Sequence, residues 1–257
     1  MRKVYILAKN TFRESIRSKI LYSIVLFAIL VVVASSIFGL VTIGDKVKVL
    51  KDFGLFALNL FGVAYVVITG SALLFKELSR KTIFNILAKP IRRSEFIWGK
   101  FLGMLMTLFL MLGMMSLALM VFLYFYSTKV DYNLMLASYS VFLQVMMVCS
   151  LVILLSSIFV TPFLSGAITF GLFLIGRSSE VILQLIESFK LQGISEYIFK
   201  TIYYLLPNLA AVDISNKVVH NFPVPAEVLI WNSVYAIGYA ALAIILASHF
   251  FSRREFN

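Results

Sequence analysis

Long uncharged runs dominate the pattern of hydrophobic and polar positions along the chain. An α-helix that rises 1.5 Å per residue needs about 20 apolar residues to cross the ~30 Å hydrocarbon core of a membrane, and most of the runs are that long. The runs cover residues 20–43, 53–75, 101–126, 134–160, 162–176 with an extension, and 228–251. This pattern predicts an all-α polytopic membrane protein with six transmembrane helices.

The fourth and fifth runs form one uncharged stretch, residues 132–176, which is too long for a single helix. Proline lacks an amide hydrogen and disfavours helical geometry in the residue before it. We therefore expect Thr161-Pro162 to be the boundary between two transmembrane helices.

Composition excludes the main alternatives to a membrane protein. The 257 residues are 61% hydrophobic and 14% charged, whereas soluble domains are about 45–50% apolar and about 25% charged. A disordered chain would need low hydrophobicity, and a disulfide scaffold would need more than the single cysteine, Cys149. A cleaved signal peptide with a small-residue site at residues 34–36 is disfavoured, because the first run continues to residue 43.

The formal net charge of +11 by itself also suggests a nucleic-acid partner. With the N-terminus inside and six crossings, the inner segments hold 15 basic and four acidic residues, and the outer segments hold eight of each. The excess positive charge then lies on one side, as the positive-inside rule requires. Anionic lipid on the cytoplasmic side accounts for this excess, so we expect cytoplasmic termini and no nucleic-acid partner.

The segment before the first run, residues 1–19, has apolar side chains at helical spacing. Tyr5, Ala8, Phe12 and Ile16 recur every three or four residues, and polar residues lie roughly opposite. This spacing is typical of an amphipathic helix that lies in the inner membrane interface. A basic flank that only fixes the topology is an equally open interpretation.

The loop of residues 76–100 is the most distinctive part of the sequence, and seven of its 25 residues are basic. Ile83, Ile86 and Leu87 give it a short apolar face, and Pro90 is expected to end that helix. An exposed charged surface with apolar anchors is typical of a docking site. A basic loop that only sets the topology would have the same composition.

Catalytic motifs are largely missing from the sequence. The chain has no G-x-x-x-x-G-K-[ST] motif, so it cannot hydrolyse ATP through a P-loop. His220 and His249 fall on opposite sides of the predicted membrane, and the acidic residues of the outer segments are scattered singly. We therefore expect no catalytic, cofactor-binding or metal-binding residues and no enzyme activity in this chain, and an intramembrane enzyme is the disfavoured alternative.

Small and polar residues form a stripe in two of the predicted spans. The stripe of the second span holds Asn59, Gly62, Val66, Thr69 and Gly70, and that of the fifth span holds Pro162, Ser165, Thr169, Phe173, Gly176 and Glu180, with Gly166 beside it. Such residues allow helices to approach closely in lipid, so tight packing is the favoured interpretation and a dimer seam the alternative. Arg177 and Glu180 are the only charges near the depth of a span, and they are either functional or a solvated pair at the outer interface.

The docking loop and its position carry a resemblance to a known family. Between its second and third spans the chain holds Glu77, Arg80-Lys81-Thr82, Leu87-Ala88-Lys89-Pro90, Arg92-Arg93-Ser94-Glu95-Phe96 and Gly99-Lys100, and Pro207-Asn208 precedes the last span. In these features it resembles the ABC-2 family of ABC transporter permeases. It is similar in particular to the small six-span permeases of the copper-enzyme-maturation and gliding-motility type.

The resemblance implies roles for the loop and for the stripes. In this family the loop after the second span forms a coupling helix that docks on a separate nucleotide-binding subunit, with the N-terminal helix as a second contact. The residues implied in docking are Glu77, Arg80, Lys81, Thr82, Leu87, Pro90, Arg92 and Arg93. Those implied in a dimer seam and substrate path are Asn59, Gly62, Thr69, Ser165, Gly166, Thr169, Phe173, Arg177 and Glu180.

The resemblance also implies a function. A permease of this kind exports a substrate by alternating access, powered by a separate ABC ATP-binding subunit that binds ATP and Mg, so the permease binds no cofactor itself. A second permease copy or a paralogue completes the transporter within the lipid of a bacterial or archaeal cytoplasmic (inner) membrane. A membrane anchor or scaffold, which recruits a cytoplasmic partner without translocation, is the alternative function.

The expected organisation is a single ABC-2 type transmembrane domain over residues 1–257. Its parts are an interfacial helix (1–19), spans one and two (20–75), a cytoplasmic coupling loop (76–100), spans three to five (101–182), an external segment (183–227), and span six with a cytoplasmic tail (228–257).

The charge distribution makes the topology testable. Reporter fusions after Asn257 and in the segment around Lys200 should report opposite sides of the membrane, because five crossings precede the second position and six precede the first. Fusions that report the same side for both positions would contradict the six-span topology.

Overall fold

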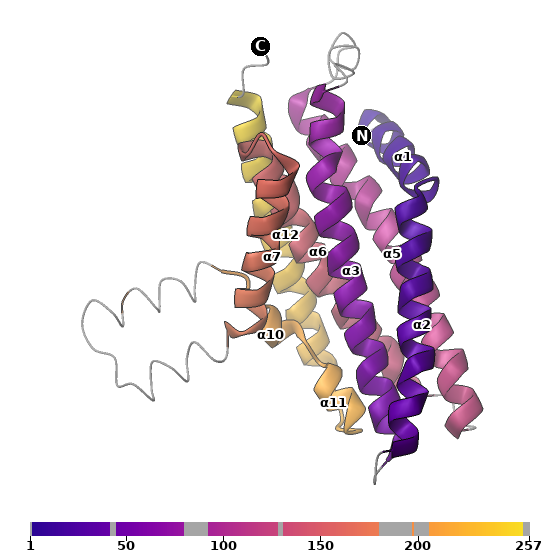
Figure 1. The fold of residues 1–257 in the computed structure, drawn as a ribbon. Coiled ribbons are helices and arrows are strands. Elements are labelled where there is room, and N and C mark those ends of the chain that lie inside the picture. The colour runs from indigo at the N-terminus through magenta and orange to yellow at the C-terminus, as the bar shows by residue number, and fades with distance from the viewer. Residues whose placement is uncertain are drawn as a thin grey trace.

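Long α-helices that run side by side make up the computed structural model of the chain (Figure 1). It describes residues 2–41, 45–79, 92–127, 131–179, 197 and 206–253, without the side chains of residues 35–41 and 77–79. The long helices are α2 (Lys19–Val41), α3 (Lys46–Ser79), α5 (Arg93–Ser127), α6 (Asn133–Ile158) and α12 (Ala226–Arg253). The shorter ones are α1 (Arg2–Ile16), α7 (Pro162–Arg177), α10 (Leu209–Val212) and α11 (Ser215–Val219). The fold is all-α throughout these ranges.

The helices include enough apolar length for a multi-span membrane protein. Within the described ranges, four segments are long and apolar enough to cross a membrane, namely Lys46–Lys76 of α3, α5, α6 and α12. A fifth crossing is reached if α1 and α2, which meet at a bend of 60°, form one span. The total of six spans stays a prediction, and the predicted fifth span is a shorter helix. Helix α7 has 16 residues, so it is about 24 Å long and shorter than the ~30 Å hydrocarbon core.

Residues 206–219 lead the chain back to the bundle and pack where α7 ends, and we call them the returning segment. An added Cβ on Gly176 would lie only 2.5 Å from the Pro207 carbonyl oxygen, so the absence of a side chain permits this contact. Asn208 then caps α10, since its Oδ1 accepts a hydrogen bond from the Ala211 backbone N–H at 2.9 Å. Helix α10 contacts α6, α7 and α12, and α11 contacts α3 and α6. Residues 206–219, which the sequence assigns to the outer segment, are therefore part of the bundle.

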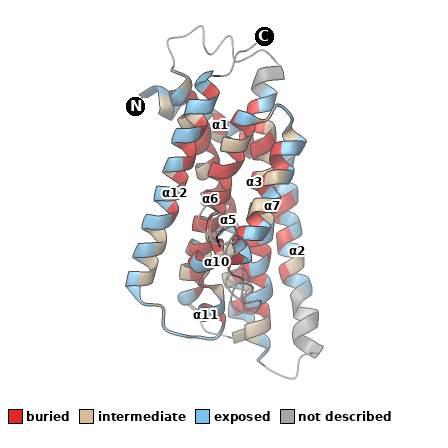
Figure 2. Cartoon of the chain, turned by 90° about the vertical axis from the view of Figure 1, so that its left-hand side faces the viewer, coloured by how far each residue is buried: buried red, intermediate tan, exposed pale blue. Residues whose placement is uncertain are grey.

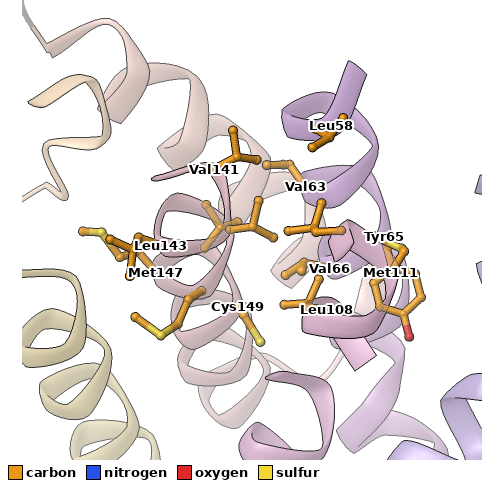
Figure 3. Packing of buried hydrophobic residues seen from close by; sticks show 14 of the residues in the cluster. Leu58, Val63, Tyr65, Val66, Leu108, Met111, Val141, Leu143, Met147 and Cys149 are labelled. Atoms are coloured by element: carbon orange, nitrogen blue, oxygen red, sulfur yellow. The ribbon is translucent and has the colours of Figure 1, made fainter. Parts of the chain in front are cut away.

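Helix α6 is the centre of the packing, and it contacts α3, α5, α7 and α12. Figure 3 shows Val141 and Cys149 of α6 among the side chains of α3 and α5. Buried residues are concentrated on α6 and α3, whereas α12 exposes much of its length (Figure 2). Close approach depends on small residues, because an added Cβ on Gly62 of α3 would lie 3.1 Å from Val145 of α6.

Helix α1 packs against the start of α5 through a face of small residues, and its predicted place in the membrane interface stays a prediction. Its buried residues are Ala8, Thr11 and Ser15, whereas the Tyr5 side chain is 58% exposed. The cause lies in α5, where an added Cβ on Gly103 would lie 2.6 Å from Thr11 Cβ and 2.7 Å from the Ala8 carbonyl oxygen. Backbones this close leave room only for small side chains at Ala8 and Thr11, while Leu7 packs one turn away against Gly99 of α5.

Both α1 and the end of α12 lie at one end of the bundle (Figure 1). We call this the inner end, following the predicted topology, and the opposite end the outer end.

The α1–α5 contact predicts opposite effects for two glycines of the same helix. Gly103→Ala should lower the thermal unfolding midpoint in detergent, because overpacking costs about 1–3 kcal/mol. Gly113→Ala is the matched control, since an added Cβ there meets nothing within 4 Å and the gain in helix propensity is the same. A midpoint for Gly103→Ala that is no lower than that of the control would contradict the close packing.

Candidate functional site

A polar cluster lies within the outer half of the bundle, where α3, α6 and α7 meet. The Gln144 side chain of α6 is fully buried. Its Oε1 accepts hydrogen bonds from Asn59 Nδ2 of α3 at 2.6 Å and from Arg177 Nη1 of α7 at 3.4 Å. Arg177 Nη1 also lies 3.0 Å from Asp213 Oδ2, which belongs to the segment between α10 and α11. The cluster therefore ties three helices to the returning segment.

The cluster lies inside the bundle, well away from the ends of α3 and α6 at the outer end. Gln144 is about 16 Å along α6 from its first residue, Asn133. Asn59 lies seven residues, or about 10 Å, beyond Asp52, the last charged residue before the uncharged run of α3. Ionisable groups at such depths are expensive unless they are paired, and they commonly mark transport pathways. The cluster is therefore a candidate functional site.

A cavity of about 310 Å³ opens beside the cluster, between α3, the end of α7 and the returning segment. Its lining includes the polar side chains of Asp52, Asn59, Arg177 and Asp213 and the apolar side chains of Phe53 and Phe56. No group of three or more His, Cys, Asp or Glu residues in the described ranges is placed to hold a metal ion. The cavity therefore offers charge pairing and hydrogen bonding beside an apolar wall.

Arg177 has an ion-pair partner that the sequence did not suggest. Glu180 falls outside the described residues, and Arg177 pairs with Asp213, whose side chain is only 16% exposed. This contact favours a built site over a freely solvated arginine. Sequence reasoning missed Gln144 and the pairing of Asp213, although an amide in a long apolar run was a usable signal.

A second ionic cluster joins the outer connections of the bundle. Lys51 of α3 forms an ion pair with Asp131, and its Nζ donates a hydrogen bond to Asn221 Oδ1 at 3.1 Å. The Lys51 side chain is only 6% exposed. Asn221 has φ 55°, a left-handed conformation that asparagine tolerates better than most residues. This cluster links the start of α3 to the connections before α6 and before α12.

The stripe of the fifth span faces the chain's own bundle. Ser165 and Thr169 are buried, and Ser156 of α6 donates a hydrogen bond to Ser165 Oγ at 3.3 Å. An added Cβ on Gly166 would lie 3.5 Å from Ser71 of α3. Phe173 is 4% exposed.

The stripe of the second span is also involved in internal contacts. Asn59 bonds to Gln144, Gly62 packs on α5 and α6, and the Thr69 hydroxyl is buried. Both stripes therefore serve packing within the chain, and their role in a dimer seam stays a prediction.

Most of the predicted docking residues cannot be placed. Arg80, Lys81, Thr82, Leu87 and Pro90 lie outside the described residues, and Glu77 belongs to the end of α3 without a described side chain. Arg92 is exposed, and its backbone N–H donates to Glu95 Oε2 at 2.8 Å. This bond helps to cap the N-terminus of α5.

Arg93 has a contact that the sequence did not suggest. Its Nη1 donates to the carbonyl oxygens of Ser252 at 2.9 Å and of Phe251 at 3.4 Å. A cation is favourable at the C-terminal end of a helix, where carbonyl groups lack intrahelical partners. The rings of Phe96 and Phe251 also stack with centroids 5.8 Å apart. The start of α5 is therefore fastened to the end of α12.

Comparison with known protein families matches residues 5–255 to the family described as ABC-2 family transporter protein. The chain belongs to the ABC-2 transporter family. It is thus a multi-pass membrane permease of an ABC transporter, and permeases of this family normally work with an ATP-binding subunit. None of the curated proteins compared with this ABC-2 permease matches it.

Asp45 and Asp131 at the outer end both pair with lysines of α3, one pair exposed and the other buried, so their substitutions should differ in effect. Asp131→Asn should lower the free energy of unfolding by about 3 kcal/mol, because it leaves the buried Lys51 without its counter-charge. Asp45→Asn should change it by less than about 1 kcal/mol, because the Lys48–Asp45 pair is exposed. Asparagine can keep the local hydrogen bond at both sites. Equal losses in denaturant titrations would contradict the buried pair.

Proposed function

We propose that this ABC-2 permease exports its substrate by alternating access and that a separate ATP-binding subunit docks at its inner end. The family assignment supports the permease role. The observation that carries the proposal is the fastening of the helices that flank the docking loop. Residues 80–91 connect α3 to α5, and α5 is tied to α12 through Arg93. A force applied to the loop therefore acts on several helices at once.

Close contacts between the helices would transmit that force. Helix α5 contacts α12 through Arg93 and the Phe96–Phe251 stack, and it contacts α1 at Gly103. Both helices would therefore move with α5. Helix α3 leads from the loop to Asn59 in the outer cluster. Closure of the ATP-binding subunits would move these helices at the inner end. Rearrangement of the Asn59–Gln144–Arg177 contacts would then open the outer end.

A second permease copy or a paralogue completes the transporter in this proposal. Helix α7 offers an apolar face for it, because Phe163 is 86% exposed and Leu174 is 49% exposed. The transporter is placed in a bacterial or archaeal cytoplasmic membrane with both termini in the cytoplasm, as the charge distribution indicates.

Charge reversal tests the docking loop. Arg80, Lys81 and Arg92 changed together to Glu should reduce, several-fold, the amount of the ATP-binding subunit that co-purifies, because rim charges control association. Arg93 is left unchanged because it holds α12. Lys46, Lys48 and Lys217 at the outer end, changed together to Glu, serve as the matched control.

The ATP-binding subunit is recognised in the purified complex by its P-loop peptide and by ATP turnover. A reporter after Asn257 should show that the loop variant keeps its topology. Full co-purification with the loop variant, or equal loss with the control, would contradict docking at this loop.

A further inference from the structure

Four basic side chains form a row along the face of α1 that is turned away from the bundle. Lys9, Arg13 and Arg17 follow one another at four-residue intervals, so they lie on one side of the helix. Arg17 follows the last residue of α1, and its N–H still bonds to the Arg13 carbonyl oxygen. Arg2, seven residues before Lys9, extends the row toward the N-terminus. All four are exposed, and at 3.6 residues per turn they lie opposite the small residues that pack on α5.

The described part of the chain gives this basic row no counter-charge. None of the ion pairs between described residues involves Lys9, Arg13 or Arg17. Residues 2–17 contain five basic residues and a single acidic one, Glu14. Like charges four residues apart on a helix repel one another, so an anion from outside the chain would stabilise the row.

An apolar flank adjoins the basic row. Tyr5, Phe12 and Ile16 recur at spacings of seven and four residues, and they project between the row and the face that packs on α5. Tyr5 is 58% exposed, and Ile6, which lies within the row itself, is 57% exposed. Basic and large apolar side chains side by side on one helix are typical of a surface that contacts both the headgroups and the acyl chains of a lipid layer.

The position of α1 places this surface against the inner leaflet of the membrane. Helix α1 lies at the inner end of the bundle and meets α2 at a bend of 60° (Figure 1), so it leans toward the membrane plane. Its small-residue face is held on α5 at Gly103, and the basic row therefore points sideways, away from the bundle. The cytoplasmic leaflet carries the anionic lipids that attract basic segments next to a span.

We propose that the basic row of α1 binds the headgroups of anionic phospholipids in the inner leaflet. The lipid phosphates lie on Lys9, Arg13 and Arg17, and the acyl chains lie along Tyr5 and Phe12. This lipid is a partner of the permease and not its transported substrate. The site depends on the predicted cytoplasmic position of the N-terminus, and it does not depend on export.

Lipid titration of the purified full-length permease in detergent, followed by native mass spectrometry, tests this surface. Phosphatidylglycerol should bind more tightly than phosphatidylcholine with the same acyl chains, because only the first has a net negative charge. Lys9, Arg13 and Arg17 changed together to Gln should reduce this preference roughly five- to twentyfold, since each basic residue near an anionic lipid surface contributes about a fivefold factor and one headgroup contacts one or two of them. Glutamine is a good helix former, so α1 should stay folded.

Two matched variants separate charge from structure. Lys9→Arg, Arg13→Lys and Arg17→Lys together keep every charge and should keep the preference for phosphatidylglycerol. Lys46, Lys48 and Lys217, changed together to Gln, remove the same number of charges at the outer end and should also keep it. Free glycerol phosphate at the concentration of the lipid should not displace phosphatidylglycerol, because it lacks the chains that contact the apolar flank.

Several outcomes would overturn this assignment. They are equal binding of the two lipids by the unaltered permease, a glutamine variant that keeps the preference, an equal loss in the outer-end variant, and displacement of the lipid by glycerol phosphate. A basic row that instead contacts the ATP-binding subunit would show a different pattern. The glutamine variant would then lose that subunit on co-purification and still prefer phosphatidylglycerol, which would also contradict the lipid surface.

Discussion

Hydrocarbon offers no hydrogen-bond partner, and this constraint determines how the helices of the permease meet. Apolar side chains gain little by leaving lipid for protein, so the helices associate through close packing and internal polar contacts. Gly62 and Gly103 let backbones approach, and Gln144 finds its partners on α3 and α7. Glycines and buried polar side chains thus determine which face of a helix is turned toward the other helices.

The same constraint explains how a short α7 is tolerated. Helix α7 ends at Arg177, and the chain between Pro207 and α11 packs against that end. Polar groups of this segment interact with other residues of the chain. The Asn208 N–H donates a hydrogen bond to Tyr235 Oη at 2.9 Å, and Asp213 forms an ion pair with Arg177. Non-helical backbone at such depth is stable only when it is buried in protein or lines a cavity. This arrangement creates the outer cavity, so the feature that breaks the regular bundle also produces the candidate site.

Local sequence predicted the long helices well, because the length of an apolar run is a local property. Helices α3, α5 and α12 cover their predicted runs, α6 ends two residues before the end of its run, and α7 begins at the predicted proline. Contacts between distant residues could not be predicted. Thr11 is buried because Gly103, far along the chain, lets the two backbones approach there. The bond from Arg93 to the end of α12 could not be predicted, because its carbonyl partners leave no trace in the neighbouring sequence.

Coupling between the inner and outer ends is the central claim, and distances between two permease copies test it most directly. In a Cys149→Ala background, spin labels at Arg253→Cys report the inner end, and labels at Asn216→Cys report the outer end; both positions are exposed. Pulsed electron paramagnetic resonance would compare the nucleotide-free complex with the complex trapped with ATP. Alternating access predicts that ATP shortens the distance between the inner labels and lengthens the distance between the outer labels. Unchanged distances at the outer end, or a change of the same sign at both ends, would contradict it.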